Sequence, residues 1–243
     1  MVHWALGTTM AQTLLIVGIK GLGRAVALHF AREGWRVLVA SRTARDVEAL
    51  AGEVTAAGGQ GRQVVCDLLR PETLAPLRSE SLDLVVAAQT SGGRFGSLPF
   101  LEIPDEELGQ VLNAYVQGTW NLLKAVGPTL LTRGRGTFVQ MGTSSGIRTR
   151  EGFAALGAAQ HGLRALVQVA AREWRPRGVH VAYLPIDGPI VSERSSQYGL
   201  PAERLLTPAA IARACAFLHA QTPDAWTHEL VLRPAAGEWT APT

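Results

Sequence analysis

The chain has 243 residues, 47% of them hydrophobic and 18% charged, so it is long enough to bury a sizeable core, and disorder is not expected. Its formal net charge is only +3 and its arginines are scattered among acidic residues, so we expect no nucleic-acid partner. The two cysteines, Cys66 and Cys215, have neither disulfide nor zinc spacing. The sequence also has no signal-peptide pattern and no apolar stretch of membrane-spanning length. These features predict a cytoplasmic protein without a metal or a membrane partner.

Short apolar runs rich in β-branched residues alternate with helical stretches along the chain. We expect residues 1–12 to form a flexible tail and residues 13–243 to form one domain. The alternation predicts a single doubly wound α/β domain of the Rossmann type, with about seven mainly parallel strands and helices on both faces of the sheet. Strands are predicted at 13–18, 35–41, 62–67, 82–88, 136–141, 179–184 and 228–233, and helices at 23–34, 46–59, 105–131, 153–174 and 208–221.

The first predicted strand ends in a glycine turn that leads into an amphipathic helix. Glycine is needed where a backbone turns tightly and approaches a pyrophosphate, and the N–H groups at a helix start attract that negative charge. The position of the turn, between the first strand and a helix, favours a dinucleotide site over a plain tight loop. The candidate contacts are Gly18, Gly21, Leu22 and Gly23.

The second predicted strand ends in Ser41-Arg42 without the acidic residue that usually binds the ribose hydroxyls of NAD. Arg42 and Lys20 of the glycine turn converge from separate loops and fit a 2′-phosphate, which favours NADP(H) over NAD. A solvent-exposed arginine at a strand end is the alternative. Asp67, after the third strand, fits either a contact near the adenine or a turn cap.

Over residues 13 to 239, approximately, the chain resembles the short-chain dehydrogenase/reductase family. The likeness lies in the glycine turn and its helix, in Asp67, in GTFVQMGTSSG at the fifth strand, in the helix from Phe153, and in the segments GVHVAYLPIDGPI and TPAAIARACAFLHAQTPDAWTHELVLRP. The resemblance implies a seven-stranded Rossmann sheet, an NAD(P)(H) cofactor, and interconversion of alcohol and carbonyl in a small-molecule substrate. It also implies a homodimer or homotetramer built through two long helices, here about 104–131 and 152–175.

The residues that carry the family's chemistry are replaced in this chain. The family uses a tyrosine with a lysine four residues later, a serine thirteen residues before the tyrosine, and an asparagine on the preceding long helix. The resemblance places Leu156 at the tyrosine, Gln160 at the lysine, Thr143 at the serine and Tyr115 at the asparagine. Lysine occurs only at 20 and 124 and tyrosine only at 115, 183 and 198, so no Tyr-x-x-x-Lys exists in any register.

Two further segments depart from the family pattern. The usual Asn-Asn-Ala-Gly after the fourth strand is Ala87-Ala88-Gln89-Thr90 here, where the resemblance implies a cofactor contact at Ala88. The glycine turn has two residues between Gly18 and Gly21, whereas the family commonly has three. The shorter turn is expected to change the backbone contacts that the family usually makes with the pyrophosphate.

Loss of a positioned general acid or base lowers the reaction rate by roughly 10² to 10⁴, so ordinary tyrosine-dependent reduction is not expected. Thr143 keeps a hydroxyl for a substrate oxygen, and Tyr115 is either a packing residue or a substitute proton donor. One open function is an NADP(H)-dependent oxidoreductase with an altered site, in which substrate or water supplies the proton. The other is a degenerate relative that binds nucleotide or a small ligand without turnover.

A serine hydrolase is a more remote alternative. Residues 142–146 match G-x-S-x-G around Ser144, with Asp187 and His219 or His228 downstream in the hydrolase order. That motif requires a helix directly after the serine, whereas residues 147–152 separate the serine from the next predicted helix.

Overall fold

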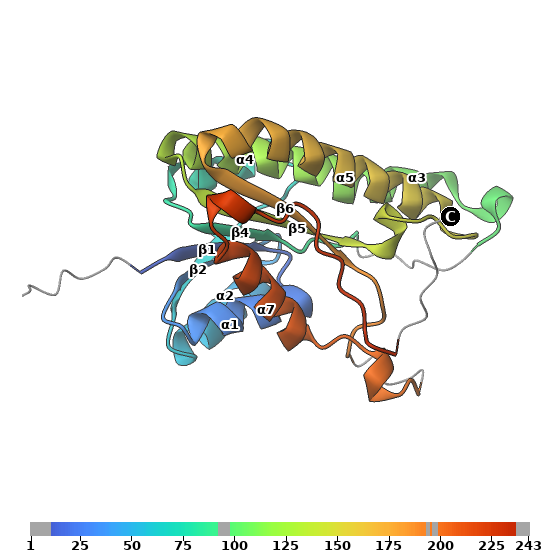
Figure 1. Cartoon of the computed structure of the whole chain (residues 1–243), viewed down its shortest axis with the longest axis horizontal. Helices are drawn as coiled ribbons and strands as arrows, with labels where there is room; N and C mark the ends of the chain where they lie inside the picture. Colours follow the sequence, from blue (N-terminus) through green and yellow to red (C-terminus); the bar gives the residue numbers. More distant parts are fainter. Residues whose placement is uncertain (1–10, 92–97, 193–194, 196–198, 237–243) are drawn as a thin grey trace, which may run out of the picture.

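The computed structural model describes residues 11–91, 98–192, 195 and 199–236. In this part of the chain, six parallel strands form one sheet in the order β3-β2-β1-β4-β5-β6 (Figure 1). Helices cover both faces, which confirms the predicted Rossmann-type α/β fold. The strands are β1 (Thr13–Val17), β2 (Arg36–Ser41), β3 (Gln60–Val65), β4 (Leu84–Ala87), β5 (Gly136–Thr143) and β6 (Val179–Ile186).

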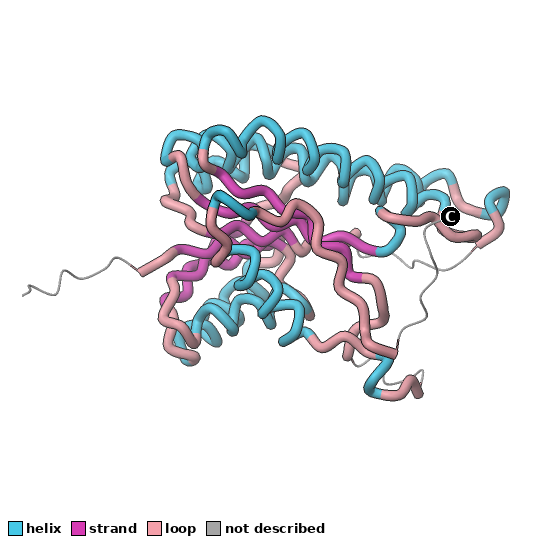
Figure 2. The backbone as a smooth tube through the Cα atoms, viewed as in Figure 1, coloured by secondary structure: helices cyan, strands magenta, loops and turns pink. Residues whose placement is uncertain are grey.

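The helices form two layers that enclose the sheet (Figure 2). One layer holds α1 (Leu22–Ala31), α2 (Ala44–Ala56) and α7 (Pro208–His219), and the other holds α3 (Asp105–Val111), α4 (Gly118–Arg133) and α5 (Ala154–Trp174) (Figure 1). The helix predicted at 105–131 runs from α3 through a π-helical turn, Leu112–Gln117, into α4. A π-helical turn is rare and is frequent at functional sites.

Side chains on successive strand residues enter opposite cores. On β6, Val181 and Tyr183 belong to the core beneath α4 and α5, whereas Ala182 and Leu184 belong to the core beneath α1 and α7. All eight residues of β6 are buried. Burial on both faces therefore explains why this strand is a continuous apolar run instead of an alternating one.

The seventh strand, predicted at 228–233, is corrected by the structure. This segment runs parallel to β6, and backbone bonds join Tyr183 N to His228 O at 2.7 Å and Leu230 N to Tyr183 O at 3.0 Å. It forms only isolated bridges, Tyr183 with Glu229 and Ile186 with Leu232, so the described sheet has six strands. The segment is held to the domain by ion pairs as well as by these bonds.

Other strand boundaries also differ from the prediction. The third strand ends at Val65, so Asp67 lies in the following loop, whereas β5 and β6 extend two residues further, to Thr143 and Ile186. Most of the predicted tail lies outside the described residues, and Gln12 at its end accepts a hydrogen bond from Arg36 N at 2.9 Å.

The outward faces of the two long helices carry exposed apolar side chains, Trp120 on α4 and Val169 on α5. Pairing of copies through these helices stays a prediction. Among the described residues, no helix is both long and apolar enough to cross a membrane.

Candidate functional site

The site lies at the carboxyl ends of the strands, where the strand order reverses. β1 pairs with β2 on one side and with β4 on the other, and the crevice at such a switch point is where doubly wound sheets bind ligands. A cleft of about 410 Å³ opens there. Seven residues to which the sequence analysis assigned a role line it: Leu22, Ala88, Tyr115, Thr143, Ser144, Gln160 and Asp187.

The glycine turn packs tightly against the end of β4. A Cβ at Gly18, whose φ is +83°, would lie 2.4 Å from the carbonyl oxygen of Ala88, and a Cβ at Gly23 would lie 1.8 Å from that of Gly18. Only glycine permits these approaches. Helix α1 then begins at Leu22 without a side-chain cap, so its first turn presents backbone N–H groups suited to a phosphate. The residues of the shortened turn thus still fit a dinucleotide.

The two predicted phosphate-binding cations have different surroundings. Lys20 is well exposed, and its Nζ lies 3.5 Å from Oδ2 of Asp46 in the first turn of α2. Arg42 is exposed directly after Ser41, at the end of β2. The sequence prediction missed Asp46, although an acidic residue at the start of the helix after the second strand was the available signal. Asp46 would compete with a 2′-phosphate for Lys20, whereas Arg42 makes no ion pair with any residue that the structure describes.

Asp67 caps the turn that follows β3. Its Oδ1 accepts a hydrogen bond from Leu69 N at 3.0 Å, and its own N–H donates to Thr73 Oγ1 at 2.9 Å. This is the turn-capping alternative raised by the sequence, and Asp67 is not among the residues that line the cleft. A contact between Asp67 and an adenine stays a prediction.

Gln160 occupies the predicted lysine position and is completely buried. Its Oε1 accepts a hydrogen bond from the backbone N–H of Thr143 at 3.1 Å. Its Nε2 and the Oγ1 of Thr143 have no hydrogen-bond partner within the described chain. Gln160 therefore holds the end of β5 in place, a task that lysine cannot perform because its side chain has no acceptor.

Leu156 occupies the predicted tyrosine position one helical turn before Gln160. It is 8% exposed and packs in the same apolar core as Tyr115. The structure does not place it among the residues that line the cleft. An aliphatic side chain here contributes packing and cannot move a proton.

Tyr115 lies in the π-helical turn, lines the cleft and is 5% exposed. Burial raises the pKa of its hydroxyl above the ordinary value. The phenol therefore stays protonated at neutral pH, where it can donate a hydrogen bond but is a weak proton donor.

A buried amide network supports the floor of the cleft. Gln89 Nε2 donates to Thr119 Oγ1 at 2.8 Å, and Gln140 Nε2 donates to the carbonyl oxygen of Ala87 at 3.2 Å and to Gln89 Oε1 at 3.3 Å. Both polar ends of Gln89 are thereby used within the protein. Gln89 fixes the end of β4 beside the glycine turn.

Asp187 forms a buried clamp at the wall of the cleft. Its carboxylate is 4% exposed and receives two hydrogen bonds from Arg148, at 2.9 and 2.7 Å, and further bonds from Arg233. Burial alone would raise the pKa of Asp187, but the two guanidinium groups outweigh it and lower that pKa. The clamp joins the loop after β5, the loop after β6 and the C-terminal segment.

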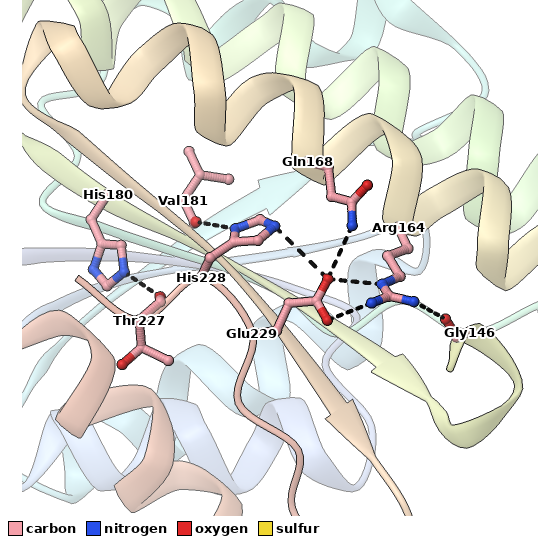
Figure 3. A network of polar contacts seen from close by, with 8 residues as sticks. All are labelled: Gly146, Arg164, Gln168, His180, Val181, Thr227, His228 and Glu229. Atoms are coloured by element: carbon pink, nitrogen blue, oxygen red, sulfur yellow. Dashed lines mark hydrogen bonds and ion pairs between the residues drawn. The ribbon is translucent and has the colours of Figure 1, made fainter. Parts of the chain in front are cut away.

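A second ion pair attaches the C-terminal segment to α5 (Figure 3). Arg164 binds both carboxylate oxygens of Glu229, at 2.8 and 2.7 Å, and also donates to the carbonyl oxygen of Gly146 at 3.3 Å. Burial alone would raise the pKa of Glu229, but Arg164 and Gln168 outweigh it and lower that pKa. The sequence prediction missed the Asp187 clamp and the Arg164–Glu229 ion pair because the members of each are far apart along the chain.

The serine-hydrolase alternative requires a histidine beside Ser144, and the structure places both candidates elsewhere. His219 bonds Thr137 at the opposite end of β5, and His228 bonds the carbonyl oxygen of Val181, several residues before the end of β6 (Figure 3). Ser144 begins a short 3₁₀ turn, and α5 starts only at Ala154.

The glycines of the G-x-S-x-G match have another explanation. A Cβ at Gly142 or at Gly146 would lie 2.2 Å from the hydroxyl of Tyr183, so both positions must be glycine to admit this buried ring. The match therefore reflects packing against Tyr183. Asp187, the third member of the proposed triad, is committed to two arginines.

Comparisons with known proteins agree with this arrangement. The family model described as Enoyl-(Acyl carrier protein) reductase matches residues 17–229. An uncharacterized oxidoreductase of Myxococcus xanthus is 32% identical over 78% of this chain and 76% of its own length. An uncharacterized oxidoreductase of Mycobacterium tuberculosis is 33% identical over 66% of this chain, but the match spans only 62% of that relative.

Solved structures give the same result. A short-chain dehydrogenase from Rhodopseudomonas palustris matches with a TM-score of 0.76 and 28% identity, over 92% of this chain and 98% of that one. An alcohol dehydrogenase from the archaeon Thermococcus sibiricus, complexed with 5-hydroxy-NADP, shares the fold with a TM-score of 0.82 and 23% identity, over 96% of this chain and 100% of that one. The chain therefore belongs to the short-chain dehydrogenase/reductase family of oxidoreductases.

Proposed function

We propose that the protein is an NADP(H)-dependent oxidoreductase of small carbonyl or alcohol compounds with a non-standard active site. The observation that carries this proposal is the glycine turn packed against Ala88, at a cleft that Thr143 lines. Membership of an oxidoreductase family supports it. The bound 5-hydroxy-NADP of the Thermococcus sibiricus enzyme supports the choice of cofactor at the level of the shared fold.

The residues of the cleft bind and orient the substrate but do not supply a strong acid. When held at the glycine turn of Gly18 and Gly23, NADP(H) would supply or accept the hydride. The hydroxyl of Thr143 donates a hydrogen bond to the substrate oxygen, and the protonated phenol of Tyr115 adds a second donor at the same cleft. The proton that completes the alcohol comes from water or from the substrate itself, because neither Leu156 nor Gln160 can deliver one.

We expect turnover to depend on the Thr143 hydroxyl. We expect Thr143→Val to lower the rate of NADPH oxidation with a carbonyl panel by about 10², the usual effect of removing one oxyanion donor. Thr129→Val, on α4 and outside the cleft, is the matched control and should leave the rate unchanged. Equal rates for wild type and Thr143→Val would contradict the assigned role of Thr143.

The preference for NADP(H) is tested at Arg42. Its replacement by glutamine should weaken NADPH binding roughly tenfold and leave NADH binding unchanged, because a hydrogen bond to a charged group contributes about 1.5–3 kcal/mol. Fluorescence titration with both nucleotides measures this, with Arg32→Gln at the far end of α1 as the control. An equal loss for both nucleotides would contradict a 2′-phosphate contact, and no wild-type binding at millimolar nucleotide would end the whole proposal.

Binding without turnover is the second candidate function. It is favoured by the burial of Leu156 in the apolar core and by the raised pKa of Tyr115, since both remove acid–base chemistry from the cleft. The rate of NADPH oxidation with carbonyl compounds distinguishes the two functions. If wild-type protein binds NADPH but oxidises it no faster than buffer does, it is a binding protein.

A further inference from the structure

The charged groups that line the cleft are unequally compensated. In the part of the chain that the structure describes, Asp187 and Arg150 are the charged residues of the lining. Both oxygens of Asp187 already accept hydrogen bonds from Arg148, and one of them also accepts from Arg233. Arg150 is exposed and makes no ion pair with any described residue. The uncompensated charge of the lining is therefore positive.

Among the described neutral side chains that line the cleft, hydrogen-bond donors are also left without acceptors. The acceptor Oε1 of Gln160 is occupied by Thr143 N–H, but its donor Nε2 is unpaired in a side chain that is fully buried. The hydroxyl of Thr143 is also without a partner in the described chain. An unpaired buried donor carries a free-energy cost that a ligand acceptor removes. The cleft therefore contains side-chain hydrogen-bond donors without acceptors in the described chain, whereas the carboxylate that lines it already accepts hydrogen bonds from arginines.

Arg150 lines two neighbouring spaces. It lines both the cleft and an adjoining hollow of about 490 Å³, which is formed with Pro99, Phe100, Thr149, Glu151, Gly152 and Ala154. Leu98 N donates to the carbonyl oxygen of Gly152 at 3.2 Å, so Leu98 is tied to the loop that carries Arg150. Arg150 is thus shared by the linings of the two spaces.

From this excess of donors we infer that the substrate is an oxo acid, whose carboxylate pairs with Arg150 while its carbonyl oxygen faces Thr143. The inference rests on the proposed function, because it names the substrate class of the same site. An arginine recognises a carboxylate through paired N–H donors, and a neutral ketone or aldehyde would leave that interaction unused.

The test compares an acid with its ester in a complex that cannot react. Wild-type protein saturated with NADP⁺ is titrated calorimetrically with 2-oxo-4-phenylbutanoate and with its ethyl ester, since the oxidised cofactor cannot reduce either compound. We expect the acid to bind about fivefold more tightly than the ester, the size expected for an ion pair at an exposed site. Added salt should weaken binding of the acid and leave the ester unaffected.

Variants of Arg150 separate this inference from the proposed function. Arg150→Gln should remove the preference for the acid without changing NADP⁺ affinity, and Arg150→Lys should keep most of it. Arg172→Gln, an exposed arginine on α5 away from the cleft, is the control. Equal affinities for acid and ester in the wild type overturn the inference, as does equal weakening of both by Arg150→Gln. Failure of NADP⁺ to bind overturns the proposed function instead.

Discussion

Replacement of Asp187 by asparagine should lower the free energy of unfolding by about 3 kcal/mol, because removal of one member of a buried ion cluster leaves the others unpaired. The carboxylate holds Arg148, whose side chain is 8% exposed, and Arg233, whose side chain is 16% exposed. Asparagine is nearly isosteric but carries no charge. The variant should therefore lose the clamp while the backbone keeps its shape.

Urea unfolding measures this loss, and Glu80→Gln is the matched control. Glu80 is also buried and also bridges two arginines, Arg36 and Arg62, but near the amino ends of the strands. Both variants should be less stable than the wild type. Only Asp187→Asn should also weaken NADP⁺ binding, because only Asp187 lines the cleft. Unchanged stability of Asp187→Asn would show that the clamp contributes nothing.

The clamp also predicts a pH dependence. The folded protein lowers the pKa of Asp187, so the stabilisation from this group is complete above the pKa of an unfolded aspartate, about 3.9. It is lost as the pH falls through the lowered pKa. The difference in unfolding free energy between wild type and Asp187→Asn should therefore shrink in acid below about pH 4 and stay constant near neutrality.

Replacement of Gln160 by lysine, the residue that the family pattern has at this position, should destabilise the protein by more than Gln160→Met does. The methionine variant loses only the bond to Thr143 N–H and leaves that donor unpaired, which costs about 1–3 kcal/mol. Lysine loses the same acceptor and also places an ammonium group where the native side chain is fully buried.

Urea unfolding of both variants, followed by NADP⁺ titration, measures these effects. The lysine variant should be the less stable of the two at pH 7, and the difference should decrease at higher pH, where the buried amine loses its charge. Equal stability of Gln160→Lys and wild type would show that Gln160 does not hold β5. A double variant, Leu156→Tyr with Gln160→Lys, therefore requires a check of folding before its activity is interpreted.

Much of the site's framework could be predicted because it depends on local patterns. The apolar runs, the helices and the glycine turn are each encoded within a few neighbouring residues, and the carboxyl ends of parallel strands necessarily meet at one edge of the sheet. Ala88 follows one such strand and Thr143 ends another, so both line the cleft, which Gln160 reaches from α5. The seventh strand was wrong because an apolar run does not specify whether its backbone continues a ladder or forms isolated bridges.

The sequence by itself determined the fold class, the position of the glycine turn and the absence of any Tyr-x-x-x-Lys pair, since each of these is a matter of residue type and spacing. Only the tertiary structure decided what the replacement residues do: Gln160 bonds the end of β5, Leu156 fills the core, and Asp187 is bound by two arginines. The physical reason is that hydrogen bonds and ion pairs depend on distances of a few ångströms between residues that lie tens of positions apart, and these distances exist only after the sheet has formed.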